Sequence, residues 1–300
     1  MKKILIITGG TSSERKISLI SAKSVKAALE KGGFETKLFD MKKGFKKLKE
    51  MTDDLDVIFP VLHGEEGEGG ELQKFLSELE KPFVGGSWKG FKKGWYKIPF
   101  KKFCEKENIL TSKWRIVKNS KDILKFGFPC VLKSSNGGSS REVVILKSEK
   151  DIKRRFAQSL LKSKSDLFVE RFLEGVEVTV GILNNEALPV IEISPPPGNW
   201  FDYKSKYSGA TREIINAPSL SSSTRQEVQK IALKINKTLN LGQYSRIDFI
   251  VSQGIPFALE ANTIPGLTSE SLFPKAAKSM GLDFPKLVKV LVETAKKKYD

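Results

Sequence analysis

Short apolar runs that end in polar or glycine-rich loops alternate with amphipathic stretches over the first 86 residues. The runs cover residues 3–7, 34–39 and 56–62, and helical patterns cover residues 17–31 and 71–79. The third run is almost unbroken, which is typical of a strand buried on both faces of a parallel sheet. Strands and helices that alternate in this way predict a doubly wound, parallel α/β domain.

The rest of the chain predicts two α+β units with antiparallel strands. We expect one long helix over 92–108, and strands at 115–117, 130–134, 143–147, 167–172, 178–183, 187–193, 244–251 and 256–261. We expect a polar loop over 194–222, and further helices at 151–159, 224–239 and 283–297. The predicted class is therefore α/β with α+β lobes, divided into residues 1–86, 87–174 and 175–300.

Composition excludes several classes of protein. With 39% hydrophobic and 29% charged residues among 300, the chain is typical of a folded globular protein. Its longest apolar runs are too short to span a bilayer, and its first residues lack a signal-peptide pattern. Cys104 and Cys130 show neither metal-ligand spacing nor a disulfide framework, which fits a reducing cytoplasm.

The net charge of +17 raises nucleic acid as a partner. However, 43 of the 52 cationic residues are Lys and nine are Arg, the residue favoured for phosphate and base contacts. In the richest stretch, Lys89–Phe103, six Lys alternate with aromatic residues. We interpret this stretch as a lysine-rich helical surface with a buried aromatic face, in preference to a base-stacking surface.

Two neighbouring strands of the C-terminal unit carry the clearest polar cluster. Alternation places Arg246 and Asp248 on one face of the first strand, and Glu260 and Asn262 on one face of the second. Gly254 supplies a turn that pairs the two strands. Two carboxylates and an amide form an oxygen-only site suited to Mg²⁺. A structural ion network of the same residues is the alternative.

A second cluster surrounds a small, flexible loop. Lys133 ends a predicted strand, and Ser and Gly residues over 134–140 expose backbone N–H groups that can approach a polyphosphate. An exposed hairpin turn is the equal alternative. An acidic hinge over 169–173, followed by Glu177, can accept hydrogen bonds from an adenine amine and a ribose.

His63 is the only histidine and follows a buried strand at the carboxyl edge, where open α/β sheets place ligands. A ligand contact and a structural hydrogen bond are equally good interpretations of it. Glu14 lies at a helix N-terminus, where capping of the helix dipole is the simpler interpretation.

Together these residues resemble a known family. The motifs that match are Thr11-Ser12-Ser13-Glu14-Arg15, Leu62-His63-Gly64, Gly67-Glu68, Gly138-Ser139-Ser140, Lys206-Tyr207-Ser208-Gly209, Arg246-Ile247-Asp248 and Glu260–Thr268. Their order and spacing resemble those of the D-alanine–D-alanine ligases of the ATP-grasp superfamily, from end to end of the chain. The resemblance implies a three-lobed ATP-grasp fold, in which a Rossmann-like pre-ATP-grasp domain precedes two lobes that clamp ATP.

The implied reaction has two steps. ATP phosphorylates the carboxylate of one D-alanine, and the amine of a second D-alanine attacks the acyl phosphate. By resemblance, Glu14 holds the first ammonium beside Ser139 and Tyr207, and His63 lies near the first carboxylate. Further catalytic and substrate-binding roles fall on Arg246 and the Gly266 N–H as oxyanion donors, and on Ser271 and Leu272 as the second-substrate site.

The resemblance also assigns the nucleotide and metal contacts. Lys97 and Lys133 meet the α- and β-phosphates, and Ser140 and Lys206 meet the γ-phosphate. The hinge residues Glu170, Arg171, Phe172 and Leu173, with Glu177, bind adenine and ribose. Two Mg²⁺ ions, with Mn²⁺ as an alternative, are held by Asp248, Glu260 and Asn262.

The family implies a cytoplasmic homodimer that takes D-alanine and ATP and serves peptidoglycan synthesis, with no membrane or nucleic-acid partner. The chain departs from the family pattern at Tyr96, where Asp is usual, and at Arg141-Glu142, where Val-Gly is usual. The alternatives are a related ligase with D-serine or D-lactate as second substrate, and a weakly active or non-catalytic basic binding protein.

Overall fold

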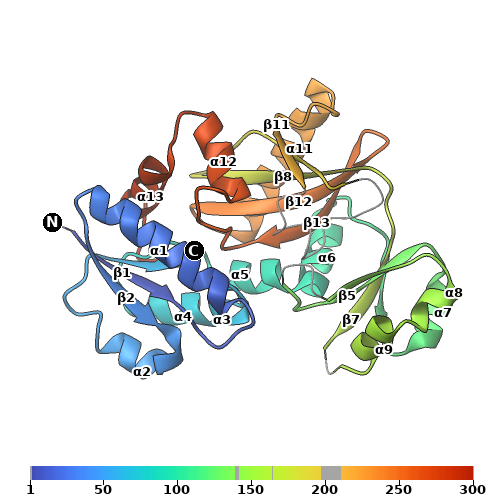
Figure 1. Ribbon diagram of the computed structural model, residues 1–300, viewed down its shortest axis with the longest axis horizontal. Coiled ribbons are helices and arrows are strands. Elements are labelled where there is room, and N and C mark those ends of the chain that lie inside the picture. The colour runs from blue at the N-terminus through green and yellow to red at the C-terminus, as the bar shows by residue number, and fades with distance from the viewer. Residues whose placement is uncertain (1, 139–141, 164, 197–210, 300) are drawn as a thin grey trace.

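The computed structural model describes residues 2–138, 142–163, 165–196 and 211–299. Its strands lie in three sheets, which occupy the left, the centre and the right of the molecule (Figure 1). None of the helices in these ranges is both long and apolar enough to cross a membrane.

The first sheet is parallel and has helices on both faces. Strands β1 (Lys3–Thr8), β2 (Glu35–Asp40) and β3 (Val57–Pro60) pair in the order β2-β1-β3. The other elements of this part are α1 (Arg15–Lys31), the 3₁₀ turn η1 (Met41–Lys43), α2 (Gly44–Lys49), α3 (Glu65–Glu68) and α4 (Glu71–Glu78).

Alternation along β1 divides the apolar side chains between two cores. Ile4 and Ile6 pack with α1 and with α13 (Phe284–Glu293), whereas Leu5 and Ile7 pack with α2 and α4. The predicted doubly wound α/β arrangement is therefore confirmed. The loop expected over 63–70 contains the short helix α3, which the sequence pattern did not predict.

The second sheet is antiparallel, as expected, in the order β4-β7-β5-β6. Its strands are β4 (Trp114–Val117), β5 (Cys130–Ser134), β6 (Val143–Leu146) and β7 (Leu167–Arg171). Three short helices pack against it at the right of Figure 1: α7 (Ser120–Phe126), α8 (Glu149–Ile152) and α9 (Arg155–Leu161). Helix α7 was not predicted, and the single helix expected over 151–159 is two helices.

The third sheet has the order β11-β10-β8-β12-β13, with β9 paired to β8. Its strands are β8 (Val176–Leu183), β9 (Glu186–Ala187), β10 (Ile191–Ser194), β11 (Arg212–Ile215), β12 (Tyr244–Ser252) and β13 (Ile255–Asn262). Helix α11 (Ser222–Leu239) covers one face, and α12 (Leu272–Ser279) packs against β8 and β11. The prediction of a polar loop over 194–222 was wrong in part, because this range contains strand β11, which pairs with β10.

The hairpin β12–β13 has the geometry that the sequence predicted. Gln253 and Gly254 both have positive φ, +51° and +78°, and form the two-residue turn between the strands. Arg246 lies opposite Asn262, and Asp248 lies opposite Glu260. The polar side chains of both strands are thereby brought together near the first sheet.

Helices α5 (Trp88–Trp95) and α6 (Lys97–Lys106) replace the single helix expected over 92–108. The chain breaks at Tyr96, whose ψ of 117° is extended. Phe91 and Phe100 are fully buried, which confirms the buried aromatic face. The expectation of a solvated lysine surface was wrong at two positions, however, because Lys97 and Lys101 are buried together with these aromatic side chains.

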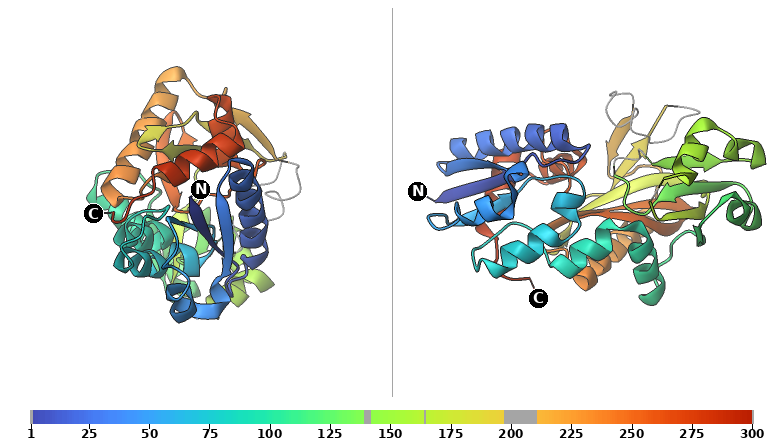
Figure 2. Two further views of the ribbon diagram at one scale, coloured as in Figure 1. Left: turned by 90° about the vertical axis from the view of Figure 1, so that its left-hand side faces the viewer. Right: turned by 90° about the horizontal axis from the view of Figure 1, so that it is seen from below.

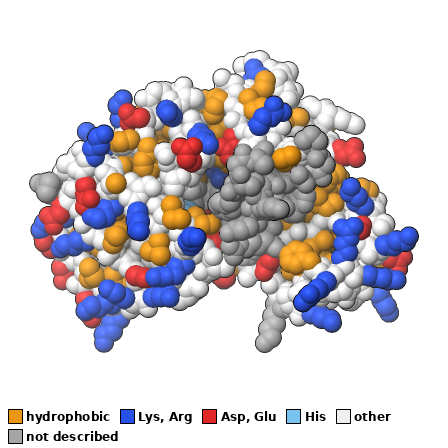
Figure 3. Space-filling model, viewed as in Figure 1, with side chains coloured by type: hydrophobic (Ala, Val, Ile, Leu, Met, Phe, Trp, Pro, Cys, Tyr) orange, Lys and Arg blue, Asp and Glu red, His pale blue; other side chains and the backbone are white. Residues whose placement is uncertain are grey.

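The chain returns to the first sheet after α12. Helix α13 packs on α1, and backbone hydrogen bonds then join Lys296 to Phe83 (Figure 2). Because these residues continue in extended form, the helix expected over 283–297 ends at Glu293. On the face shown in Figure 3, Lys and Arg are spread over both ends of the molecule and interspersed with Asp and Glu.

Candidate active site

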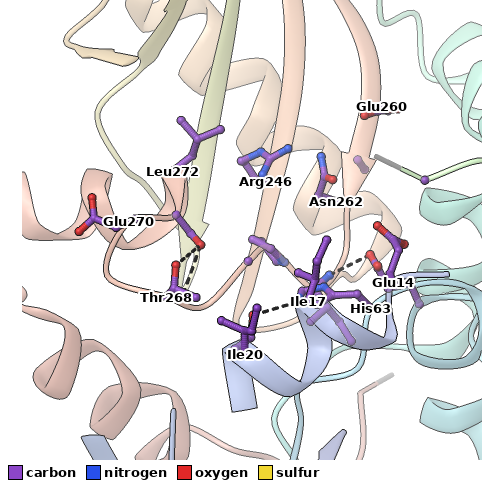
Figure 4. Close-up of a pocket in the computed structure, with 18 of the residues that line it drawn as sticks. Glu14, Ile17, Ile20, His63, Arg246, Glu260, Asn262, Thr268, Glu270 and Leu272 are labelled. Atoms are coloured by element: carbon purple, nitrogen blue, oxygen red, sulfur yellow. Dashed lines mark hydrogen bonds between the residues drawn. The ribbon is translucent and has the colours of Figure 1, made fainter. Parts of the chain in front are cut away.

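A cavity of about 830 Å³ lies between the first and third sheets. Residues from the start of α1 face strands β12 and β13 across it, and the loop before α12 closes a third side (Figure 4). The predicted substrate residues that line it are Glu14, His63, Arg246, Gly266, Ser271 and Leu272. These residues come from four separate segments of the chain, and the fold brings them together in one cavity.

A second cavity, of about 540 Å³, lies between the second and third sheets. The predicted nucleotide residues that line it are Lys133, Glu170, Arg171, Phe172, Leu173 and Glu177, together with Asp248. Lys97 and Glu260 line both cavities. The two cavities therefore meet where the polar hairpin β12–β13 faces the N-terminus of α6.

Arg246 and Asp248 form a two-pronged ion pair on β12. Arg246 Nε donates to Asp248 Oδ1 and its NH2 group donates to Asp248 Oδ2, both at 2.9 Å. Burial opposes the charged guanidinium, but the Asp248 carboxylate outweighs burial and raises the pKa of Arg246. Thr179 Oγ1 and Asn262 Nδ2 also donate to Asp248, at 2.5 and 2.9 Å.

The chemistry of these donors fits a hard cation. In the described residues, no three His, Cys, Asp or Glu side chains are arranged so that they could hold a metal ion. The candidate set is instead the two carboxylates Asp248 and Glu260 with the amide of Asn262, all from one hairpin. Oxygen-only sets of this kind suit Mg²⁺ that keeps water and phosphate oxygens as its other ligands.

Lys97 lies at the junction of the two cavities. Its Nζ donates to the Gly137 carbonyl at 2.6 Å and lies 3.3 Å from Glu260 Oε2. Its backbone N–H donates to the Ser135 carbonyl at 2.8 Å, and the Ile98 N–H donates to Ser135 Oγ at 3.2 Å. The Ser/Gly loop is thus fastened to the first turn of α6.

Glu14 and His63 lie on the opposite wall of the first cavity. His63 Nε2 is 3.3 Å from Ser21 Oγ, and its backbone N–H donates to Ser18 Oγ at 2.9 Å. Burial lowers the pKa of His63 despite the nearby Glu14 charge, so the imidazole is neutral. A Cβ on Gly138 would lie 2.7 Å from Glu14 Oε2, so the Ser/Gly loop approaches Glu14 closely.

Gly266 and Ser271 form the third wall. A Cβ on Gly266 would lie 2.9 Å from Ser271 Oγ, so the backbone at Gly266 passes close to that hydroxyl. Ser271 Oγ is also 2.9 Å from Thr268 Oγ1. This contact keeps the loop compact, and Gly266 and Thr268 line the cavity together with Arg246.

Glu170, for which a hydrogen bond to adenine or ribose was predicted, forms two ion pairs at the second cavity. It is buried between Lys101 and Lys133, at 2.5 Å from the Nζ atom of each. Burial would raise the pKa of Glu170, but the two lysine charges outweigh it and hold the pKa at about 2. Glu170 is thus a charged member of a buried cluster at the edge of the cavity.

Comparisons with known proteins identify the family. The family model for the D-ala D-ala ligase C-terminus matches residues 92–293. The D-alanine–D-alanine ligase of Maridesulfovibrio salexigens is 35% identical, covering 98% of this chain and 99% of that protein. The ligase of Aquifex aeolicus is 38% identical over 97% of this chain and 99% of its own. The chain belongs to the D-alanine–D-alanine ligase family.

Solved structures of this family have the same fold. The D-alanine–D-alanine ligase of Bacillus anthracis complexed with ATP superposes with a TM-score of 0.84 at 29% identity, covering 98% of this chain and 97% of that one. The D-alanyl-alanine synthetase A of Vibrio cholerae gives a TM-score of 0.83 at 25% identity, covering 98% of each chain. The expected ATP-grasp fold is therefore confirmed.

The departure from the family pattern at Tyr96 has a local explanation. Tyr96 is the N-cap residue of α6, but its Oη donates to Glu65 Oε1 at 2.5 Å. The Tyr96 side chain therefore accepts no hydrogen bond from the first N–H groups of the helix. Ser135 provides the missing acceptors instead. These hydrogen bonds allow α6 to begin at Lys97, which lies in the first turn of the helix.

Four predicted site residues, Ser139, Ser140, Lys206 and Tyr207, lie outside the described residues, as does Arg141. Three described residues at the site had no predicted role: Glu68, Lys101 and Thr179. Glu68 accepts hydrogen bonds from the Gly64 and Ile264 N–H groups and from Thr263 Oγ1. Lys101 follows Lys97 by four residues, and this spacing could have predicted that both side chains lie on the same face of a helix.

Proposed function

We propose that this protein is an ATP-dependent ligase that joins two D-alanine molecules for peptidoglycan synthesis. The observation that carries the proposal is the meeting of two cavities at Lys97 and Glu260. One cavity presents ammonium- and carboxylate-binding groups, and the other presents buried lysines beside an apolar hinge. A carboxylate in the first cavity is thereby brought next to the phosphates of a nucleotide in the second.

The first step transfers the γ-phosphoryl group of ATP to a carboxylate oxygen of one D-alanine and releases ADP. Glu14 holds the ammonium of this substrate beside Ser139 and Tyr207, and the neutral His63 lies near its carboxylate. A neutral His63 adds no second buried cation to the cavity that Arg246 lines.

In the second step the amine of another D-alanine attacks the acyl carbon, and inorganic phosphate leaves. Arg246 and the Gly266 N–H stabilise the negative charge on the tetrahedral oxygen. Ser271 anchors the second carboxylate, and the buried Leu272 shapes the site for its methyl group. Because the acyl phosphate supplies the activation, no side-chain nucleophile is required.

The nucleotide residues act mainly through charge and position. Lys97 and Lys133 bind the α- and β-phosphates, Ser140 and Lys206 the γ-phosphate, and residues 170–173 with Glu177 the adenosine. Asp248, Glu260 and Asn262 would hold two Mg²⁺ ions, or Mn²⁺ in their place. Such ions supply neutralisation of the phosphate charge, the main need of phosphoryl transfer.

We further propose a cytoplasmic homodimer with no nucleic-acid partner, and units bounded at residues 86 and 174. The buried, unpaired Cys104 and Cys130 are compatible with a reducing compartment. Buried carboxylates aimed at the nucleotide cavity support an enzyme rather than a non-catalytic basic binding protein, since they would repel a polyanion.

The test is detection of the dipeptide by mass spectrometry with ATP, Mg²⁺ and D-alanine. We expect D-Ala–D-Ala from D-alanine, none from L-alanine, and none from the Asp248→Ala and Glu260→Ala variants. Parallel reactions with D-serine or D-lactate as partner identify a different second substrate. A folded wild-type protein that binds ATP but forms no product from any of these would contradict the proposal.

A further inference from the structure

A buried cluster of three charges lies at the inner edge of the nucleotide cavity. Glu170 on β7 has one carboxylate oxygen 2.5 Å from Lys133 Nζ on β5 and the other 2.5 Å from Lys101 Nζ on α6. The side chains of Lys101 and Glu170 are only 1% and 2% exposed. A buried lysine requires partners of this kind, because an isolated buried charge is strongly unfavourable.

Lys101 differs from its two partners in its access to the cavity. Lys133 and Glu170 line the cavity, whereas Lys101 lies behind them and lines neither cavity. Its Nζ also donates to Thr111 Oγ1 at 2.5 Å, and that hydroxyl donates to the Ala258 carbonyl at 2.7 Å. Lys101 therefore connects α6, the second sheet and β13 through one ammonium group.

The net charge of this cluster determines how strongly Lys133 would attract a phosphate group. Burial lowers the pKa of Lys101, and the adjacent Glu170 carboxylate opposes this shift by favouring the charged ammonium. With both lysines protonated, two ammonium groups and one carboxylate leave a net charge of +1 for a phosphate. Without Lys101, Glu170 and Lys133 would form a neutral pair, and the carboxylate would compete with phosphate for Lys133. Glu177 and Glu260 add to this competition, because both also raise the pKa of Lys133.

We propose that Lys101 is a positioning residue for the nucleotide, which neutralises Glu170 from behind and so leaves the Lys133 charge available to the phosphates of ATP. This inference rests on the proposed function insofar as the cavity between the second and third sheets binds ATP. It assigns Lys101 an effect on ATP affinity rather than on the chemical steps.

The first experiment compares Lys101→Met with Lys102→Met, a matched control because Lys102 is the exposed neighbour on the same helix. Calorimetric titration with ATP and Mg²⁺ measures the dissociation constant. We expect about tenfold weaker binding for Lys101→Met and no change for the control, since leaving a buried charge uncompensated is costly. At saturating ATP, kcat for dipeptide formation should stay within about threefold of wild type while KM for ATP rises.

A double variant separates charge from packing. Lys101→Met/Glu170→Gln removes one positive and one negative charge, so Lys133 again carries a net charge of +1. We expect the double variant to bind ATP more tightly than Lys101→Met alone, because the competing carboxylate has gone. If Lys101 only fills space or supports the fold, the double variant binds no better than the single one.

Unfolding temperatures are measured for each variant, and Lys101→Gln replaces Lys101→Met if the latter does not fold. Unchanged ATP affinity in a folded Lys101 variant would overturn the inference and leave the ligase proposal intact. Absence of ATP binding by the wild-type protein would instead contradict the proposed function itself.

Discussion

Arg246 and Asp248 hold each other in a defined geometry. The guanidinium plane is fixed by two hydrogen bonds to Asp248, and Asp248 is fixed in turn by Thr179 and Asn262. A donor fixed in this way needs little reorganisation when charge develops on a nearby oxygen. In the proposed function, the same carboxylate would orient the oxyanion donor and hold a metal ion.

Replacing Arg246 with Lys should keep the charge and lose the two-pronged geometry. We expect kcat to fall by about 10²–10³, the usual loss for one oxyanion donor, with a much smaller change in KM for ATP. Steady-state kinetics with D-alanine and ATP varied separately measure both effects. A large rise in KM for ATP with unchanged kcat would show that Arg246 acts on the nucleotide instead.

Glu68 makes stability depend on pH. Burial and the nearby Glu14 charge raise the pKa of Glu68 from 4.5 to about 8. The folded protein therefore binds the Glu68 proton over a pH range in which the unfolded chain has lost it, and stability falls as pH rises from 4.5 towards 8. The slope from this one group is at most about 1.4 kcal/mol per pH unit.

Glu68→Gln removes this titration. We expect the free energy of unfolding of the variant, relative to wild type, to rise between about pH 5 and pH 8. Urea unfolding at several pH values in this range measures the difference. A constant difference would mean that Glu68 is ionised throughout the range.

At the scale of elements, short-range patterns predicted most of the strands and the β12–β13 hairpin, but not where α5 ends and α6 begins. The β12–β13 hairpin follows from alternation and from Gln253-Gly254, all within one stretch of chain. The break at Tyr96 depends on Ser135, almost 40 residues later, and on Glu65. Strand β11 likewise exists because β10 lies beside it. The proposed substrate and metal residues share short motifs, and the alternation along each strand was enough to predict that Arg246, Asp248, Glu260 and Asn262 lie together. The Lys101–Glu170 pair joins distant segments and left no such local pattern.

Ser135 should therefore behave as the cap of α6. We expect Ser135→Ala to lower the free energy of unfolding by about 1 kcal/mol, as for loss of an N-cap, and to raise KM for ATP because Lys97 is in the first turn. Ser222→Ala, an exposed serine in the first turn of α11, is the control and should change stability by less than about 0.5 kcal/mol. Thermal unfolding and kinetics of both variants decide between a cap and an ordinary loop serine.

At the scale of the whole molecule, the last residues fasten the first sheet to the third. Lys296 pairs with Phe83 through the backbone, and Tyr299 Oη donates to the Phe83 carbonyl at 2.8 Å. Gln243, just before β12, accepts from the Gly85 N–H at 3.0 Å and donates to the Leu291 carbonyl at 2.9 Å. One buried amide thus joins the first unit, the third sheet and the C-terminal helix.

Gln243→Ala should loosen this connection without touching the reaction. The Gly85 N–H and the Leu291 carbonyl both lose a buried partner, so we expect a loss of about 2–4 kcal/mol in the free energy of unfolding. Gln243 lines neither of the two cavities that meet at Lys97, so kcat well below the unfolding temperature should stay within about threefold of wild type. Gln226→Ala, on the exposed face of α11, is the control for loss of a glutamine. If kcat falls while the unfolding temperature is unchanged, Gln243 influences the relative placement of the lobes during turnover rather than their stability.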